Sequence, residues 1–161
     1  MIKSTWQGKK TFKAQSKFGH DIISDAPTES GGDDNGPSPV ELMLSGLAGC
    51  TGIDVTNLMK ERLAQVTKLE ITVDDEREDT TSRSVKHVTL TFDVEGEVDL
   101  KKLKRSIKLS VDKYCTVAHS LKATIEPKLI FNFEYMVLAI YKMLHKNSTH
   151  ANLHLNLTFV L

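Results

Sequence analysis

The stretch SPVELMLSGLAGCTGIDV, residues 38–55, decides the fold, because it joins a complete helix start to a long apolar run. Ser38 is a favoured N-cap residue, Pro39 suits the first helical position, and Glu41 stands three residues after the cap. These residues form a capping box, in which Ser38 and Glu41 each bond the backbone N–H of the other. The pattern predicts a helix from Pro39 to about Ala64.

This helix is expected to be buried, because apolar side chains cover nearly the whole circumference of its first turns. Its middle contains Gly46, Gly49 and Gly52. Each glycine inside a helix costs about 1 kcal/mol relative to alanine. We therefore expect another element to approach the helix backbone closely at these positions.

The segments around this helix alternate between apolar and polar residues, which is typical of strands. After Gly96, Asp99 is a candidate cap for a second helix that extends to about Lys113. The predicted order is β-β-β-α-β-β-α-α-β, an α+β fold. The predicted strands are residues 2–6, 10–15, 20–24, 68–77, 85–95 and 124–133, with a polar loop over 25–38 and a short third helix over 116–122.

Composition narrows the possible partners. The chain has 161 residues and 40% hydrophobic residues, which suits one domain with a real core. Lys plus Arg and Asp plus Glu both number 21, so no net charge favours nucleic acid or an anionic membrane. The first residues lack the basic-then-apolar pattern of a signal peptide, and the sequence has no uninterrupted apolar run long enough for a membrane span. We expect a cytoplasmic protein with no nucleic-acid or membrane partner.

The two cysteines are the candidate chemical groups. Cys50 lies in the apolar helix, where a cysteine is commonly only a small buried hydrophobe. Cys115 lies where the second helix ends and the third begins, and a helix N-terminus favours the thiolate. If the fold brings them together, they form a peroxidatic and resolving pair. The spacing alone does not decide this.

The sequence supports a metal site or a nucleotide site less well than a pair of reactive cysteines. Cys115 and His119 share a helical face, and Cys50 would complete three zinc ligands, but structural zinc sites usually use two closely spaced pairs. The glycine-rich loop lacks the Gly-Lys-Ser/Thr end of a phosphate loop and the order of an EF-hand. We expect neither a metal nor an organic cofactor.

Two motifs resemble the OsmC/Ohr family, the osmotically induced and organic-hydroperoxide-resistance proteins. They are GGDDNGPSPVELMLSGLAGCTGIDV (residues 31–55) and DKYCTVAHSL (residues 112–121). The sequence is more similar to the YhfA-like branch of general OsmC proteins than to the hydroperoxide-resistance branch. The resemblance covers residues 1 to about 133, and we regard 134–161 as a C-terminal extension of unknown character that contains a candidate helix over 134–146.

The resemblance implies an intertwined homodimer with a long central helix and two sites at the subunit interface. It implies that Cys50 is the peroxidatic cysteine and Cys115 the resolving one, in a peroxidase that reduces organic hydroperoxides during oxidative stress. An external thiol or dithiol would reduce the Cys50–Cys115 disulfide. Glu41 is a candidate assisting carboxylate.

The same resemblance leaves an alternative open. The hydroperoxide-resistance branch uses an arginine from the N-terminal part, whereas this sequence has none before Arg62. That branch also has a glutamate ten residues before the reactive cysteine, where this sequence has Val40 and places Glu41 next to it. The alternative is a non-catalytic dimer of the same fold that binds a small apolar ligand or a partner at the interface.

Overall fold

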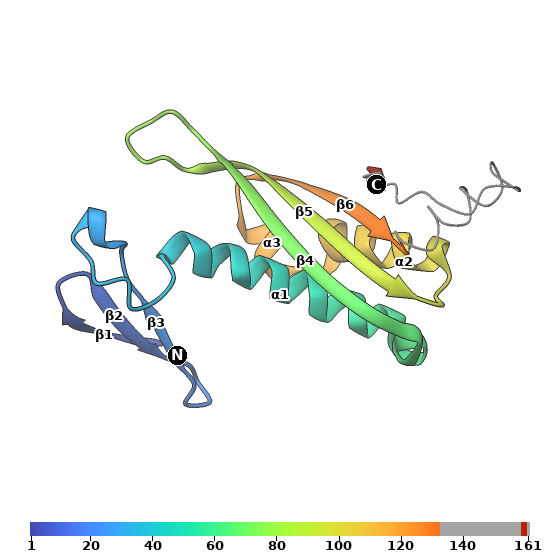
Figure 1. Cartoon of the computed structure of the whole chain (residues 1–161), viewed down its shortest axis with the longest axis horizontal. Coiled ribbons are helices and arrows are strands. Elements are labelled where there is room, and N and C mark those ends of the chain that lie inside the picture. The colour runs from blue at the N-terminus through green and yellow to red at the C-terminus, as the bar shows by residue number, and fades with distance from the viewer. Residues whose placement is uncertain (133–158, 161) are drawn as a thin grey trace, which may run out of the picture. The chain divides into compact units, whose positions relative to one another are not determined.

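The computed structural model describes residues 1–132 and 159–160. They form an α+β fold with a three-stranded and a four-stranded sheet, as the sequence predicts for the fold class (Figure 1). The chain divides into two compact units, Met1–Gly46 and a second unit that begins at Leu47. Each unit is described by itself.

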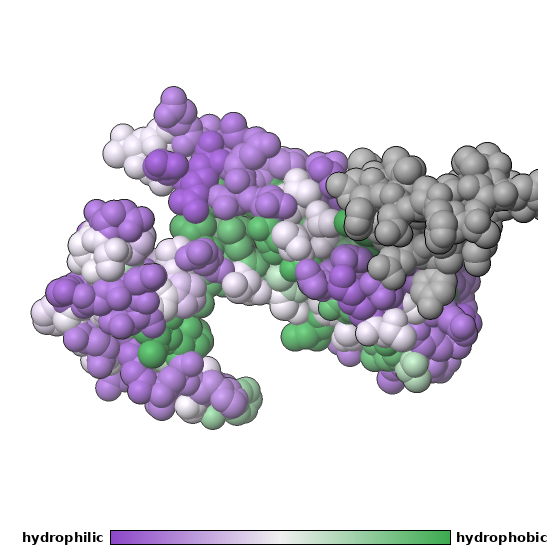
Figure 2. Space-filling view, in the orientation of Figure 1, coloured by the Kyte–Doolittle hydropathy of each residue, from purple (hydrophilic) through white to green (hydrophobic). Residues whose placement is uncertain are grey.

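The N-terminal unit is built on an antiparallel meander. Its strands β1 (Lys3–Gly8), β2 (Thr11–Gln15) and β3 (Asp21–Ser24) pair in chain order, which confirms the predicted meander. The register places Trp6 opposite Phe12, so both rings share one face of the sheet. Trp6 is 62% and Phe12 44% exposed, and Figure 2 shows apolar surface on this unit. The meander therefore has an apolar face that its own unit does not cover.

Asp25 organises the loop that follows the meander. The side chain is almost fully buried, and its carboxylate accepts hydrogen bonds from the Thr11 hydroxyl (2.9 Å) and from the backbone N–H groups of Ala26 (2.8 Å), Asp33 (3.2 Å) and Asn35 (3.1 Å). Burial by itself would raise the pKa of Asp25, but these hydrogen bonds to the charged form outweigh it and lower the pKa. An ionised Asp25 thus holds the loop together.

The long helix α1 (Pro39–Met59) begins where the sequence predicts. The Ser38 N–H donates to a carboxylate oxygen of Glu41 (2.7 Å), and the Glu41 N–H donates to the Ser38 hydroxyl oxygen (3.3 Å). The predicted capping box is confirmed. The α-helix ends before Ala64 and continues as the 3-10 helix η2 (Lys60–Gln65); a shorter 3-10 turn, η1 (Thr28–Ser30), lies in the preceding loop.

The second unit contains a mixed sheet of four strands in the order β4-β5-β6-β7. Strands β4 (Val66–Arg77) and β5 (Val85–Gly96) are antiparallel, β6 (Thr124–Phe131) is parallel to β5, and β7 (Phe159–Val160) is antiparallel to β6. Strand β7 lies in the extension 134–161, for which no strand was assigned from the sequence. The candidate helix over 134–146 lies outside the described residues.

Three helical segments connect β5 to β6. Helix α2 (Leu100–Leu109) is capped by Asp99, which accepts hydrogen bonds from two backbone N–H groups, as predicted. The helical run extends to Tyr114, close to the predicted end at about Lys113, but its last turn is a π-helical turn, η3 (Ser110–Tyr114), in place of α-helix. The short helix α3 (Thr116–Ser120) follows.

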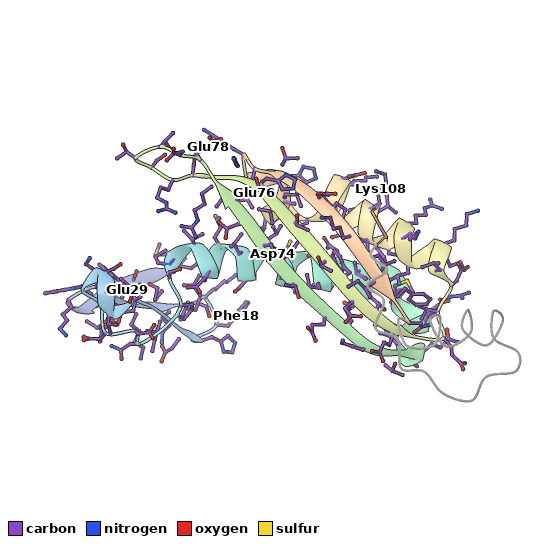
Figure 3. The ribbon with its side chains drawn as sticks, turned by 45° about the horizontal axis from the view of Figure 1, so that its top comes forward. Phe18, Glu29, Asp74, Glu76, Glu78 and Lys108 are labelled. Carbon is purple, nitrogen blue, oxygen red and sulfur yellow. The ribbon has the colours of Figure 1, made fainter. Side chains whose placement is uncertain are left out.

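The core of this unit lies between the sheet and α1. Ile71 of β4 is opposite Phe92 of β5, and its Cδ1 lies 3.1 Å from the place where a Cβ on Gly52 would be. Helix α1 therefore packs on the apolar face of the sheet, and the close approach predicted at Gly52 is confirmed. The other face is polar, and Figure 3 shows Asp74 and Glu76 on β4. The fully buried core of the sheet is Val88, Leu90, Phe92, Val94 and Leu129.

Helix α1 is covered on one side only, so the expectation of burial around its whole circumference is wrong for the single chain. Its buried side chains in the second unit form one stripe, and Ile53 on the opposite side is 63% exposed. Apart from its own helix and chain neighbours, a Cβ added to Gly46 or Gly49 would meet no atom of the described residues within 4 Å, so no other described element of the same chain approaches the helix there. The segment Pro39–Gln65 is long and apolar enough to cross a membrane. Its stripe of Leu47, Thr51, Val55 and Met59 is buried.

Candidate functional site

The π-helical turn η3 positions two side chains toward α1. The Cys115 N–H donates to the backbone carbonyl of Ser110 (2.9 Å), five residues earlier, which is the π-helical pattern. The buried Ser110 hydroxyl donates to a carboxylate oxygen of Asp54 (3.0 Å) and lies 3.4 Å from the Thr51 carbonyl oxygen. The turn thus fixes the start of α3 beside the middle of α1.

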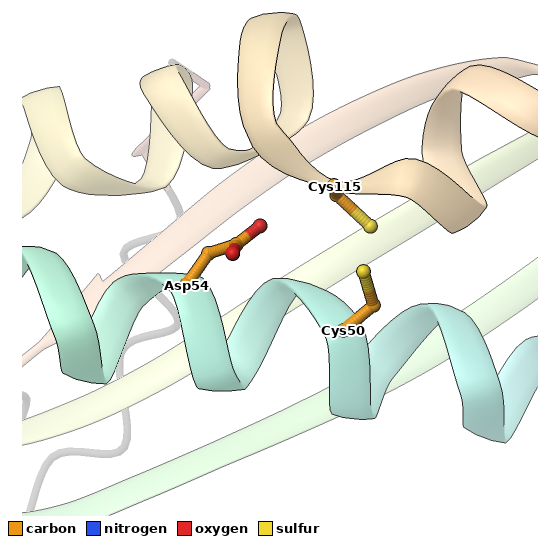
Figure 4. Close-up of side chains that lie close together, drawn as sticks. All are labelled: Cys50, Asp54 and Cys115. Carbon is orange, nitrogen blue, oxygen red and sulfur yellow. The ribbon is translucent and has the colours of Figure 1, made fainter.

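Three reactive groups meet at this place. Cys50 and Asp54 stand one helical turn apart on α1, and Cys115 faces them from the N-cap of α3 (Figure 4). The two sulfur atoms and a carboxylate oxygen of Asp54 all lie within 4.8 Å of one another. The fold therefore brings together the two cysteines that the sequence singled out.

The environment of Cys115 favours the thiol. Its side chain is fully buried. Burial, followed by the contact with Cys50, raises its pKa to about 11, although the N–H of Ala118 donates to its sulfur (3.3 Å) and acts in the opposite direction. The expectation that the helix start favours a Cys115 thiolate is wrong, because α3 has only five residues and burial dominates.

Cys50 is more accessible than Cys115. Its side chain is half-buried, and both cysteines are free thiols. Cys50 is therefore the more exposed of the two cysteines.

The other two candidates from the sequence, Glu41 and His119, are not part of this cluster. The Glu41 carboxylate bonds the backbone at the start of α1, and an assisting role for it stays a prediction. His119 is exposed, and the cluster contains Asp54 in place of it. The sequence analysis missed Asp54 and Ser110. The four-residue spacing from Cys50 was a signal for Asp54, whereas no local pattern marked Ser110.

Comparisons with known proteins agree with the two motifs. A family model described as OsmC-like protein matches residues 31–129. Protein YhfA of Escherichia coli (strain K12) is 35% identical over 122 residues, which cover 74% of this chain and 87% of YhfA. This identity extends over most of both sequences.

Solved structures show the same fold. An OsmC like protein from Mycoplasma pneumoniae has a TM-score of 0.68 at 18% identity, over 81% of this chain and 95% of that one. The organic hydroperoxide resistance protein OhrB of Bacillus subtilis has a TM-score of 0.54 at 20% identity, over 82% and 98%. With the family match and the identity to YhfA, these similarities confirm the resemblance inferred from the motifs: the chain belongs to the OsmC/Ohr family of OsmC-like proteins.

Proposed function

We propose that the protein is a thiol-dependent peroxidase that reduces organic hydroperoxides in oxidative stress defence. The observation that carries this proposal is the position of the Cys50 and Cys115 sulfur atoms, within 4.8 Å of each other on two different elements. A disulfide needs a sulfur–sulfur distance of about 2.05 Å. The proposed disulfide therefore requires the two sulfur atoms to move closer together than they lie in this structure.

The proposed reaction has three steps. The Cys50 thiolate attacks the terminal peroxide oxygen, the O–O bond breaks, and the alkoxide takes a proton and leaves as an alcohol. Cys115 then attacks the Cys50 sulfenic acid, loses its proton, and forms a disulfide as water leaves. An external thiol or dithiol finally supplies two electrons and restores both thiols by exchange.

The surroundings of the two thiols support this division of roles. Cys50 is half-buried and can meet a peroxide, whereas Cys115 is fully buried and has a raised pKa. A resolving cysteine acts only after the first thiol has been oxidised, so it needs contact with Cys50 more than contact with solvent. Glu41 is proposed as an assisting carboxylate on the family resemblance alone.

We also propose that two copies form a homodimer in the cytoplasm. Trp6 and Phe12 lie on an apolar sheet face that their own unit leaves uncovered, and Ile53 is exposed on α1. The backbone of the same helix is not covered by another described element at Gly46 and Gly49. A second copy would cover these surfaces. The cytoplasm keeps thiols reduced, as the first step requires.

The test is a reaction of the reduced protein with cumene hydroperoxide, followed by thiol counting and mass spectrometry. We expect the wild type to lose both thiols and to form a Cys50–Cys115 disulfide. Cys50→Ser should not react, and Cys115→Ser should accumulate a sulfenic acid that dimedone traps. If the wild-type thiols stay reduced under excess peroxide, the proposal is wrong.

A second candidate function is a non-catalytic dimer that binds a small apolar ligand or a partner. What supports it is the sequence before Arg62, which contains no arginine to hold a thiolate and has Val40 where the hydroperoxide-resistance branch has a glutamate. Native mass spectrometry of the purified dimer should then show a bound ligand, and the thiols should survive peroxide. Rapid turnover of peroxide would contradict this function.

A further inference from the structure

We propose that Cys50, Asp54 and Cys115 form a binding site for a thiophilic divalent cation, Zn²⁺, in the reduced protein. A bound zinc ion would occupy both sulfur atoms and so block their reaction with peroxide. This regulatory part rests on the proposed peroxidase function, whereas the cation site itself does not.

The distances fit a zinc ion. The two sulfurs and the carboxylate oxygen lie within 4.8 Å of one another. Tetrahedral zinc with bonds of about 2.3 Å to sulfur requires the sulfurs to lie about 3.8 Å apart. The present separation of at most 4.8 Å is therefore close to the spacing that a shared zinc ion requires.

The groups around the three ligands would hold them in place. The Ser110 hydroxyl binds one oxygen of Asp54 (3.0 Å), and the N–H of Ala118 donates to the Cys115 sulfur (3.3 Å). Such second contacts orient the ligands of metal sites and tune their affinity. Cys50 and Asp54 are further constrained because they stand on consecutive turns of α1.

The chemistry of the ligands selects the ion. Two thiolates favour zinc over magnesium or calcium, which prefer oxygen ligands. Three protein ligands leave a fourth position for water, as in open zinc sites. Binding releases the two thiol protons and transfers no electrons, so removal of the zinc ion returns the reduced dithiol. A Cys50–Cys115 disulfide cannot form the site.

The experiment uses the reduced full-length chain, with Co²⁺ as a spectroscopic probe and Zn²⁺ as the competitor. We expect one Co²⁺ per chain, with a thiolate-to-cobalt absorption band that one equivalent of Zn²⁺ removes. Asp54→Asn and Cys115→Ser should each weaken binding at least about 10-fold. Asp74→Asn is the matched control, because Asp74 is exposed on the outer face of β4, and it should bind as the wild type does.

Two results would overturn the inference: no cobalt–thiolate band in the wild type, or wild-type affinity in folded Asp54→Asn. Circular dichroism checks that each variant is folded, and Asp54→Asn tests the site even if Cys115→Ser does not fold. If the metal-free protein reduces peroxide but binds no cobalt, the proposed zinc site is wrong, whereas the proposed peroxidase function is supported. If the protein binds zinc but its metal-free thiols do not react with peroxide, the zinc site is supported. The proposed peroxidase function and the regulatory role of zinc are then both wrong.

Discussion

Ser110 holds Asp54 in place beside the two thiols: its hydroxyl hydrogen bonds to the Asp54 carboxylate at 3.0 Å, although 56 positions separate them in the sequence. This bond joins the π-helical turn η3 to the middle of α1. Together with the 3.4 Å contact from the same hydroxyl to the Thr51 carbonyl, it attaches one wall of the candidate site to the other.

Ser110→Ala is expected to lower the free energy of unfolding by about 1 to 2 kcal/mol, because Ser110 is fully buried and its removal leaves Asp54 without this donor. It should also weaken Co²⁺ binding about 10-fold. Urea unfolding and cobalt titration measure the two effects. Ser120→Ala is the control, since the exposed Ser120 hydroxyl bonds only the backbone of its own helix (2.7 Å). Equal effects of the two substitutions would contradict the role of Ser110.

Asp25 should make the N-terminal unit sensitive to acid. Its pKa is lowered in the folded state, so its ionised form contributes stability above the unfolded pKa of 3.8. That contribution is lost as the pH falls through the folded pKa. We expect the wild type to become less stable between pH 5 and strongly acidic pH.

Asp25→Asn tests this prediction. The variant should be less stable than the wild type at pH 7 and should lose less stability on acidification. The single tryptophan of the chain, Trp6, lies in this unit, so its fluorescence during urea unfolding is a suitable measurement. A variant with the same acid dependence as the wild type would show that another group is responsible.

Ile53→Glu should convert the proposed dimer to monomers, because it places a charge on the exposed apolar side of α1. Size-exclusion chromatography with light scattering measures the mass in solution. Thr72→Glu, on the polar face of β4, is the control and should leave the mass unchanged. A wild type with the mass of one chain would contradict the dimer itself.

Phe92→Ala should lower the free energy of unfolding by about 3 to 5 kcal/mol, because it removes the largest fully buried side chain among the described residues and leaves a cavity between sheet and helix. Urea unfolding followed by circular dichroism measures this loss. Thr72→Ala, on an exposed position of the neighbouring strand, should change stability by less than about 0.5 kcal/mol. A small loss for Phe92→Ala would mean that the core is not packed around this ring.

The parts of the fold that the sequence predicts are those with local causes. The capping box of Ser38 and Glu41, the Asp99 cap and the alternation along β4 and β5 depend on residues only a few positions apart. Each of these interactions joins residues that are close in the sequence, so it forms as soon as the local helix or strand forms. They could therefore be inferred without knowledge of distant contacts.

The rest depends on distant contacts. Burial of Cys115 reverses the effect expected from its place at a helix start. Ser110 gains its role only because η3 lies against α1. The glycines Gly46 and Gly49 are not covered by another described element of this chain, and in the proposed dimer a second copy would cover them. No spacing within the sequence reports such contacts.

The π-helical turn η3 sets how many residues separate Ser110 from Cys115. A π turn contains one residue more than the corresponding α-helical stretch. Deletion of one residue between Val111 and Tyr114 would let this turn close as an α-helical turn, in which the N–H of Cys115 still bonds the Ser110 carbonyl. A chain that is one residue shorter here would therefore keep its two thiols together, so this segment can tolerate a change of length without losing the pair of cysteines.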